Sequence, residues 1–275
     1  MTNTGTATVK LSFWLIIIAC LDAGLLSCWW FVDIVGGIMK NHILSFVLVV
    51  SSVVFVGVSG VSAQHDETSK GVAGGGVLVK GWTGEIDAKE KTAGLTLNSA
   101  KLAEEGKGMH VTTGPAVTYW NPKNVAKGDY TVSATFTESK YMSINDHPHP
   151  YGIMVGGNDL GTANASYLYC AAYGNGSFIF RGMGPAPFQL GGRAPIKNDA
   201  VSKAAGVGQP VTQIIGITVK GDSITCSINN KVVATHTRAE VVGEGKLKST
   251  DGVYGMRFGH NTDATVMDFK KSKAQ

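Results

Sequence analysis

The clearest pattern in the chain is an alternation of apolar and polar positions across residues 212–237. Three alternating segments follow one another, separated by Gly221-Asp222 and Asn229-Asn230, residues that favour tight turns. A period of two predicts strands with one buried and one wetted face, so the stretch reads as a three-stranded meander. Such a meander needs a second sheet to cover its apolar face. The apolar positions are Ile215, Ile217, Val219, Ile224, Cys226 and Ile228.

Shorter segments of the same kind recur along the chain at regular spacing, with turn residues between them and no long amphipathic helical pattern. This arrangement predicts an all-β fold, a two-sheet antiparallel β-sandwich or jelly roll. Gly182–Gln209 differs, because its prolines and glycines predict a long irregular loop. The other expected strands are Val77–Lys80, Leu95–Asn98, Met109–Thr113, Ala116–Trp120, Asp129–Thr137, Tyr151–Val155, Ser166–Tyr173, Ser177–Arg181, Gly252–Phe258 and Ala264–Lys270.

The N-terminal region has the composition of a targeting segment. Residues 43–59 are strongly apolar, follow Met39–His42 and lead into Val61-Ser62-Ala63, which is typical of a secretory signal cleaved after Ala63. We expect a secreted or periplasmic protein, with an uncleaved membrane anchor as the alternative. Because the signal begins at an internal methionine, we interpret the apolar residues 1–38 as an upstream-start artefact, or alternatively as an extra transmembrane segment. We therefore expect four parts: the artefact or extra apolar segment at 1–38, a signal peptide at 39–63, a flexible linker at 64–76 and a β domain at 77–275.

The amino-acid composition and the net charge limit the kinds of molecule that we expect the protein to bind. The chain has 275 residues, 36 glycines and only 16% charged residues, which suits a β protein rich in turns. Its net charge of +4 comes from scattered lysines and not from a basic stripe with interleaved aromatic residues, so we expect no nucleic-acid partner. We expect membrane contact only through an uncleaved N-terminal segment, and an envelope protein stays open as a partner.

The cysteines and histidines of the β domain bear on disulfides and metals. Cys170 and Cys226 are each in phase with apolar neighbours, so we expect two buried thiols, with a disulfide, which an oxidising compartment would permit, as the alternative. The pair His147 and His149 is too close together, and too stiffened by Pro148, to hold a metal ion by itself. No zinc or calcium motif is present in the sequence. We expect no metal site and no cofactor, with calcium bound by scattered loop oxygens as an open alternative.

Several segments of the back half resemble a known superfamily. The Gly221-Asp222 turn, a strand ending in Asn229-Asn230-Lys231, the segment Asp251–Arg257 and the closing strand Val266–Phe269 look like those of concanavalin A-like jelly rolls. Within that superfamily they are most similar to laminin G-like domains and to the bacterial 3-keto-disaccharide hydrolase type. The resemblance covers Trp82–Lys271. It implies a sandwich with one concave sheet, carbohydrate binding on that face or its rim loops, and glycoside hydrolysis in the hydrolase-type members.

Sugar sites combine aromatic platforms with polar groups that fix hydroxyls. Tyr167 and Tyr169 alternate with apolar residues of one strand, and Arg257 is out of phase with its apolar neighbours, so all three are expected opposite the core. His147–Tyr151 is expected to form a rim loop, because its prolines fix the backbone. The alternative is that the aromatic residues cover a second apolar face and the arginines are solvated. The candidate ligand-binding residues are Tyr119, Trp120, His147, His149, Tyr151, Tyr167, Tyr169, Arg181, Arg257 and His260.

Glycoside hydrolysis requires two carboxylates about 5–10 Å apart. Glu85 and Asp87, near Trp82, form a close acidic pair, and their spacing on an extended segment puts both on one face. We expect this pair to lie in a solvated turn, with a catalytic role as the alternative, and His149 is a further catalytic candidate. We expect a carbohydrate-binding module. The alternatives are a glycoside-acting hydrolase and a non-catalytic structural or adhesive envelope protein.

The start of the mature chain is testable. N-terminal sequencing and intact mass of the native protein should give a chain that begins at Gln64, because the small residues before it fit signal peptidase. A product that keeps residues 1–38 would contradict the internal start. A product that begins at Met39 would identify an uncleaved anchor.

Overall fold

A computed structural model describes residues 68–274 of the chain. The expected signal peptide and upstream segment, residues 1–63, lie outside the described residues. Within the described range, no helix is both long enough and apolar enough to cross a membrane.

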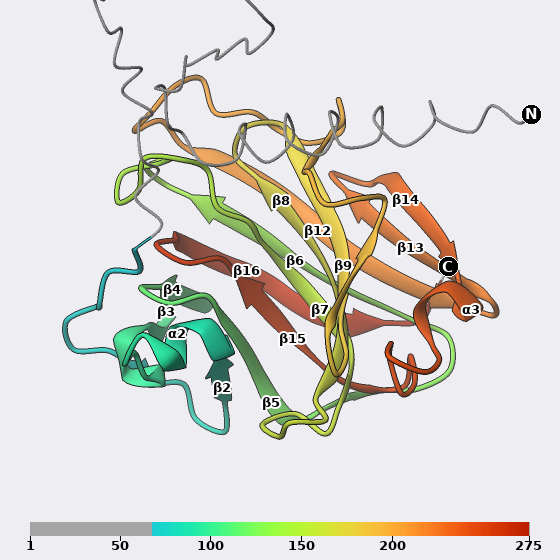
Figure 1. Ribbon diagram of the computed structural model, residues 1–275. Coiled ribbons are helices and arrows are strands. Elements are labelled where there is room, and N and C mark those ends of the chain that lie inside the picture. Colours follow the sequence, from blue (N-terminus) through green and yellow to red (C-terminus); the bar gives the residue numbers. More distant parts are fainter. Residues whose placement is uncertain (1–67, 275) are drawn as a thin grey trace, which may run out of the picture. The chain divides into compact units, whose positions relative to one another are not determined.

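Two sheets of mostly antiparallel strands pack face to face (Figure 1). The first sheet is, in spatial order, β1 (Gly76–Val77), β3 (Lys101–Glu105), β4 (Gly108–Thr112), β16 (Asp263–Ser272), β6 (Tyr130–Glu138), β12 (Val211–Lys220), β13 (Ser223–Ile228) and β14 (Lys231–Thr237). The second sheet is β10 (Pro187–Leu190), β9 (Ser177–Met183), β8 (Ser166–Tyr173), β7 (Tyr151–Asn158), β15 (Gly252–Phe258), β5 (Val117–Ala126) and β2 (Thr83–Ile86), with β11 (Ile196–Lys197) also paired to β9. The helical segments are α2 (Ala88–Thr92), α3 (Arg238–Val241) and the 3₁₀ turn η1 (Leu97–Ser99). The predicted two-sheet antiparallel sandwich is confirmed.

The core lies between the two sheets and contains the inward positions of both. Phe136 on β6 stacks on Tyr151 of β7 with ring centroids 5.7 Å apart, and it meets Phe258 of β15 edge-on at 6.0 Å. All three side chains are essentially inaccessible to solvent. Burial of one such ring contributes about 1.5–3 kcal/mol, so these contacts across the interface hold the sheets together.

Four local expectations were wrong. The strand expected at Val77–Lys80 ends at Val77, and a turn follows it. Leu95–Asn98 is not a strand but leads into η1, because Thr96 and Ser99 form a reciprocal capping box. The strand expected to end at Trp120 continues through Pro122, where the pairing of β5 with β15 shifts register and so tolerates a missing N–H. The expected loop Gly182–Gln209 contains β10 and β11, which extend the second sheet beyond β9.

The described part of the expected linker is hydrogen bonded to the β domain. The N–H of Lys70 donates to Oδ1 of Asn261 at 2.8 Å, and the N–H of Val72 donates to the carbonyl of Ser99 at 3.1 Å. Gly114 allows this approach, since a Cβ there would overlap the Lys70 carbonyl. The segment therefore lies against the sandwich, while the expected domain boundaries stay predictions.

A disulfide joins the two sheets. Cys170 lies on β8 of the second sheet and Cys226 on β13 of the first, with Cα atoms 6.0 Å apart and both side chains fully buried. From the sequence we expected two buried thiols, with this disulfide as the alternative. The choice depends on the packing of the two sheets, which places the inward faces of β8 and β13 opposite each other.

The disulfide should make a large contribution to stability. It joins residues 56 apart, and the loop-entropy estimate for that length is about 4 kcal/mol. Urea unfolding of the oxidised protein should therefore have a clearly higher midpoint than unfolding with reductant. The variant Cys170→Ala/Cys226→Ala should unfold at a lower urea concentration than the oxidised protein, and its midpoint should not change when reductant is added. An oxidised protein whose unfolding curve does not change on reduction would contradict the bond.

Candidate functional site

The outer face of the second sheet, turned away from the core, carries a row of aromatic side chains. Trp120 on β5 and Tyr167 and Tyr169 on β8 point to this side, and for the two tyrosines the alternation along β8 predicted it. They pack with Met154 and Ile179 into a second apolar cluster, so each is less than a tenth exposed. These aromatic side chains are therefore held in place by their neighbours and are mostly shielded from solvent.

A buried ion pair crosses this face. Nη1 of Arg257 on β15 donates to Oδ1 of Asp87 at 2.7 Å, and Nη2 donates to Oδ2 at 2.6 Å. Nη1 also lies 3.2 Å from Oγ1 of Thr118, whose hydroxyl is hydrogen bonded to that of Tyr167 at 3.0 Å. The guanidinium also lies over the ring of Tyr169, 5.8 Å from its centroid. A bidentate pair fixes the orientation as well as the position of both groups.

The electrostatics of this pair follow from burial and charge. Burial by itself lowers the pKa of Arg257, but the charge of the Asp87 carboxylate and its hydrogen bonds to the guanidinium outweigh that effect, and the pKa of Arg257 is raised. Burial also raises the pKa of Tyr167, although Arg257 acts in the opposite direction. The arginine therefore stays charged and the Tyr167 hydroxyl stays protonated, available for hydrogen bonding.

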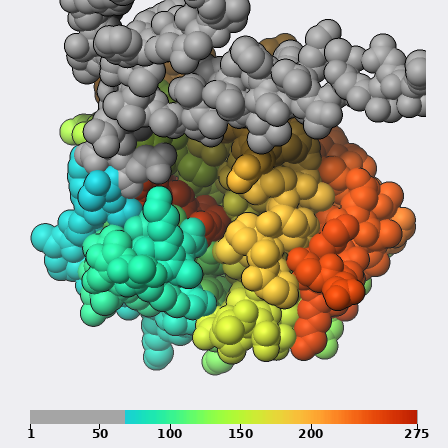
Figure 2. Space-filling model, in the orientation of Figure 1, coloured from blue at the N-terminus to red at the C-terminus, as the bar shows by residue number. Residues whose placement is uncertain are grey.

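A cleft lies beside this pair. One cavity of about 440 Å³ and a second of about 660 Å³ adjoin each other. The first is bounded by β2 and α2, by the outer face of β5 and β8, and by the loop 160–165. Figure 2 shows the surface hollowed between the teal atoms around α2 and the yellow atoms of β9 and β10. Both cavities are lined by Glu85, Ile86, Lys91, Trp120, Leu160 and Gly161.

The charges at the cleft are balanced. Glu85 accepts a hydrogen bond from Lys91 Nζ at 2.5 Å, and Asp87 is neutralised by Arg257 beneath it. Both carboxylates line the first cavity, as their spacing on one face predicted. Each is engaged by a cation, however, so the cleft offers polar groups without a large net charge.

The other candidate residues lie elsewhere. Tyr119 and Tyr151 point into the core and are inaccessible to solvent, so neither faces the cleft. Arg181 is on the outer face of β9, opposite Tyr169 in register, but its Nη2 donates to the carbonyl of Arg193 and it does not line either cavity.

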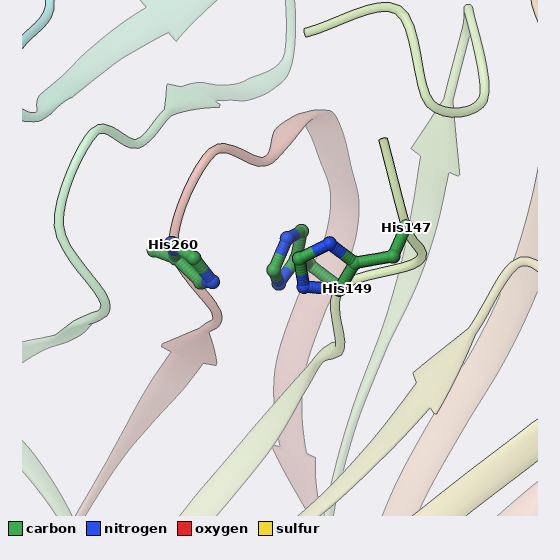
Figure 3. Close-up of side chains that lie close together, drawn as sticks. All are labelled: His147, His149 and His260. Carbon is green, nitrogen blue, oxygen red and sulfur yellow. The ribbon is translucent and has the colours of Figure 1, made fainter. Parts of the chain in front are cut away.

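Three histidines form a separate group. His147 and His149 come from the loop before β7, and His260 comes from the loop after β15 (Figure 3). His149 lies between the other two, with ring centroids 4.2 Å from His147 and 4.0 Å from His260. None of the three lines either cavity beside Glu85 and Asp87, so the catalytic candidates do not form one constellation.

Three contributors to the cleft were missed from the sequence. Thr118 is in phase with Trp120 on β5, so the alternation of that strand held the signal. Lys91 and the loop 160–165 had no such signal, because they reach the cleft only through the packing of α2 and a loop around the sheet.

No family model matches the sequence, and a search of curated proteins finds no match either. Among solved structures, carbohydrate-binding module CBM66 from Bacillus subtilis is 11% identical, with a TM-score of 0.46 over 72% of this chain and 99% of that one. A protein of unknown function with a galectin-like fold, from the same organism, is 14% identical, with a TM-score of 0.48 over 71% and 90%. Sheep galectin-11 in complex with glycerol is 10% identical, with a TM-score of 0.37 over 62% and 100%.

These likenesses all have TM-scores below 0.5, so the function of this chain has to be argued from its own residues. The two observed sheets form the antiparallel sandwich that the resemblance implied. Neither the laminin G-like nor the hydrolase-type subgroup is matched by a family model.

The two ion pairs of the cleft should differ sharply in their effect on stability. Asp87→Asn leaves the buried Arg257 without a counter-charge and should cost about 2–3 kcal/mol, at the low end for a broken buried pair because Asp87 is partly exposed. Glu85→Gln breaks a solvent-exposed pair and should cost less than about 1 kcal/mol. Urea unfolding of the two variants measures this difference, and equal costs would contradict the structural role of the Arg257 pair.

Proposed function

We propose that this protein is an extracytoplasmic carbohydrate-binding module that binds a glycan in the cleft on the outer face of the second sheet. The observation that carries the proposal is that two adjoining cavities share an aromatic side chain, Trp120, and a polar pair, Glu85 and Lys91. An aromatic surface beside hydrogen-bonding groups suits a ligand with one apolar and one hydroxylated face.

The size of the cleft supports an oligosaccharide. Each cavity lies within the range of about 300–1,000 Å³ that small-molecule sites occupy. Two adjoining cavities that share lining residues suit a ligand built of consecutive units. A linear glycan fits this requirement better than a single compact metabolite.

The charge balance supports a neutral ligand. Glu85 and Asp87 present carboxylate oxygens that accept hydrogen bonds from hydroxyls, while Lys91 presents a donor. Because Lys91 and Arg257 offset the two carboxylates, no uncompensated charge is available to attract a phosphate or a strongly cationic group. A neutral polyhydroxylated chain is the ligand class that this arrangement favours.

Glycoside hydrolysis is the second candidate, because Glu85 and Asp87 line one cavity. A hydrolase needs one carboxyl group that holds a proton and donates it to the leaving oxygen. Here each carboxylate is engaged by a cation, and Asp87 is held by two hydrogen bonds from one guanidinium. This arrangement favours binding over turnover.

The extracytoplasmic location rests on two independent features. The sequence predicts a signal peptide cleaved after Ala63, and the β domain holds the disulfide between Cys170 and Cys226. Structural disulfides persist in oxidising compartments and are rare in the cytosol. Secretion or export to a periplasm accounts for both features.

A glycan array with the mature protein tests the function. Binding of neutral oligosaccharides is expected, and Trp120→Ala should weaken it about 5- to 30-fold, because loss of an aromatic contact surface costs roughly 1–2 kcal/mol. Trp82→Ala is the matched control, since Trp82 packs on Phe269 and lines neither cavity. Glu85→Gln provides a second cleft variant that leaves the core untouched.

The outcomes separate the candidates. Binding that is lost in the Trp120 variant and kept in the Trp82 variant supports the proposal. Chromatography of incubated glycans that shows cleavage, abolished by Glu85→Gln, would replace the module with a hydrolase. Absence of any glycan signal from a folded protein would overturn carbohydrate binding and favour a structural or adhesive role.

A further inference from the structure

The group of three histidines brings imidazole nitrogens together from two distant parts of the chain. One nitrogen from each of His147, His149 and His260 lies within 4.8 Å of the other two. The rings are inclined to one another by 57° to 75°, and that of His149 lies between the other two (Figure 3). Such a convergence does not follow from sheet packing, because all three residues lie on loops.

The loop that carries His260 is fixed by buried hydrogen bonds. Oγ1 of Thr113 donates to the carbonyl of Gly259 at 2.7 Å and accepts from the N–H of Thr262 at 2.8 Å. Asn261, which is 1% exposed, donates to the carbonyl of Thr68 through Nδ2 and accepts the N–H of Lys70 on Oδ1. The side chain of His260 therefore projects from a backbone with little freedom to move.

The two loops are also fastened to each other. The N–H of Gly259 donates to the carbonyl of Pro150 at 2.7 Å, and Nδ2 of Asn145 donates to the carbonyl of Asn261 at 2.7 Å. A Cβ on Gly259 would lie 2.7 Å from Cδ of Pro150 and 3.2 Å from Cβ of His149, so only glycine permits this approach. The distance between His149 and His260 is thus set by the backbone.

Neighbouring groups orient two of the rings. Nδ1 of His147 lies 2.5 Å from Oδ1 of Asp146, and Nδ1 of His260 lies 3.4 Å from Oγ of Ser69. A metal-ligating histidine commonly uses one nitrogen for the ion and donates the other N–H to a carboxylate or hydroxyl. With Nδ1 kept in these contacts, Nε2 of His147 and of His260 would be the atom that coordinates an ion.

The donor set selects the ion. Three imidazole nitrogens suit zinc and neighbouring late transition metals, whereas calcium and magnesium require oxygen ligands. Zn–N bonds of about 2.0–2.1 Å in a tetrahedral site place ligand nitrogens roughly 3.4 Å apart, so the imidazoles reach an ion after small side-chain rotations. Three protein ligands leave the fourth position for water or a bound group.

We propose that His147, His149 and His260 form a zinc-binding site, distinct from the carbohydrate cleft, in which Asp146 orients His147. We expected no metal site from the sequence, because only the neighbouring pair His147 and His149 stands out there. The third ligand, His260, is distant in sequence and is brought next to the pair by the pairing of β15 with β7. Bound zinc would cross-link the loop before β7 to the loop after β15.

Metal titration of the untagged mature protein tests this site. After treatment with a chelator and dialysis, Zn²⁺ should bind with one ion per chain in calorimetry and raise the melting temperature, because a ligand of the folded state stabilises it. Co²⁺ should give the visible absorption of a tetrahedral nitrogen site. His147→Ala and His260→Ala should each weaken binding about 100-fold, and Asp146→Asn about tenfold.

Two other histidines serve as matched controls. His110 is paired with Asp263 and His236 with Glu240, both outside the cluster, so His110→Ala and His236→Ala should bind Zn²⁺ like the parent protein. Trp120→Ala should also keep the zinc site, whatever its effect on glycan binding. A protein that takes up no Zn²⁺ and gives no Co²⁺ spectrum would overturn the proposal, as would stoichiometric binding that survives His147→Ala/His260→Ala.

Discussion

The ion pair between Arg257 and Asp87 is the contact on which the cleft depends. Asp87 lies between β2 and α2, which together form one wall of the cleft, whereas Arg257 belongs to β15 in the middle of the second sheet. Two parallel hydrogen bonds hold the wall against the sheet at a fixed angle. A charged pair in this mostly buried position is stabilising only when both partners are present, so the sequence has to supply the two together.

The strand β15 and the residues that follow it contribute to the core, to the cleft and to the group of three histidines. Its inward residues Met256 and Phe258 pack in the core, its outward residue Arg257 anchors the cleft wall, and its continuation carries His260. The strand is hydrogen bonded to β5 on one side and to β7 on the other. A rigid, central strand is a suitable carrier, because displacement of its neighbours would have to break pairing on both sides.

The two proposed sites use different physical devices. The cleft presents a broad aromatic and polar surface whose charges are offset by ion pairs, which suits a neutral ligand held by many weak contacts. The histidine group presents three nitrogens at a single point, which suits one cation held by a few strong bonds. The cleft is built mainly on strands of the second sheet, whereas the histidines lie on loops that are fixed by buried hydrogen bonds.

The sequence by itself determined the β-sandwich and the orientation of its strands. Side-chain direction alternates with a period of two, which is a local property, so the outward position of Tyr167, Tyr169 and Arg257 could be predicted from neighbouring residues. The same periodicity placed Cys170 and Cys226 inside. Whether they met depended on which strands the two sheets set opposite each other.

Only the tertiary structure decided which of these residues meet. Strand order in the second sheet places β15 between β7 and β5, although the three are far apart in sequence, and this brings Asp87 to Arg257 and His260 to His149. It also sent Tyr151 into the core, because a side chain that ends a loop and begins a strand can face either way until the partner strands are known. Pattern along a chain fixes the face of each residue, but contacts between distant residues depend on long-range pairing that no local pattern contains.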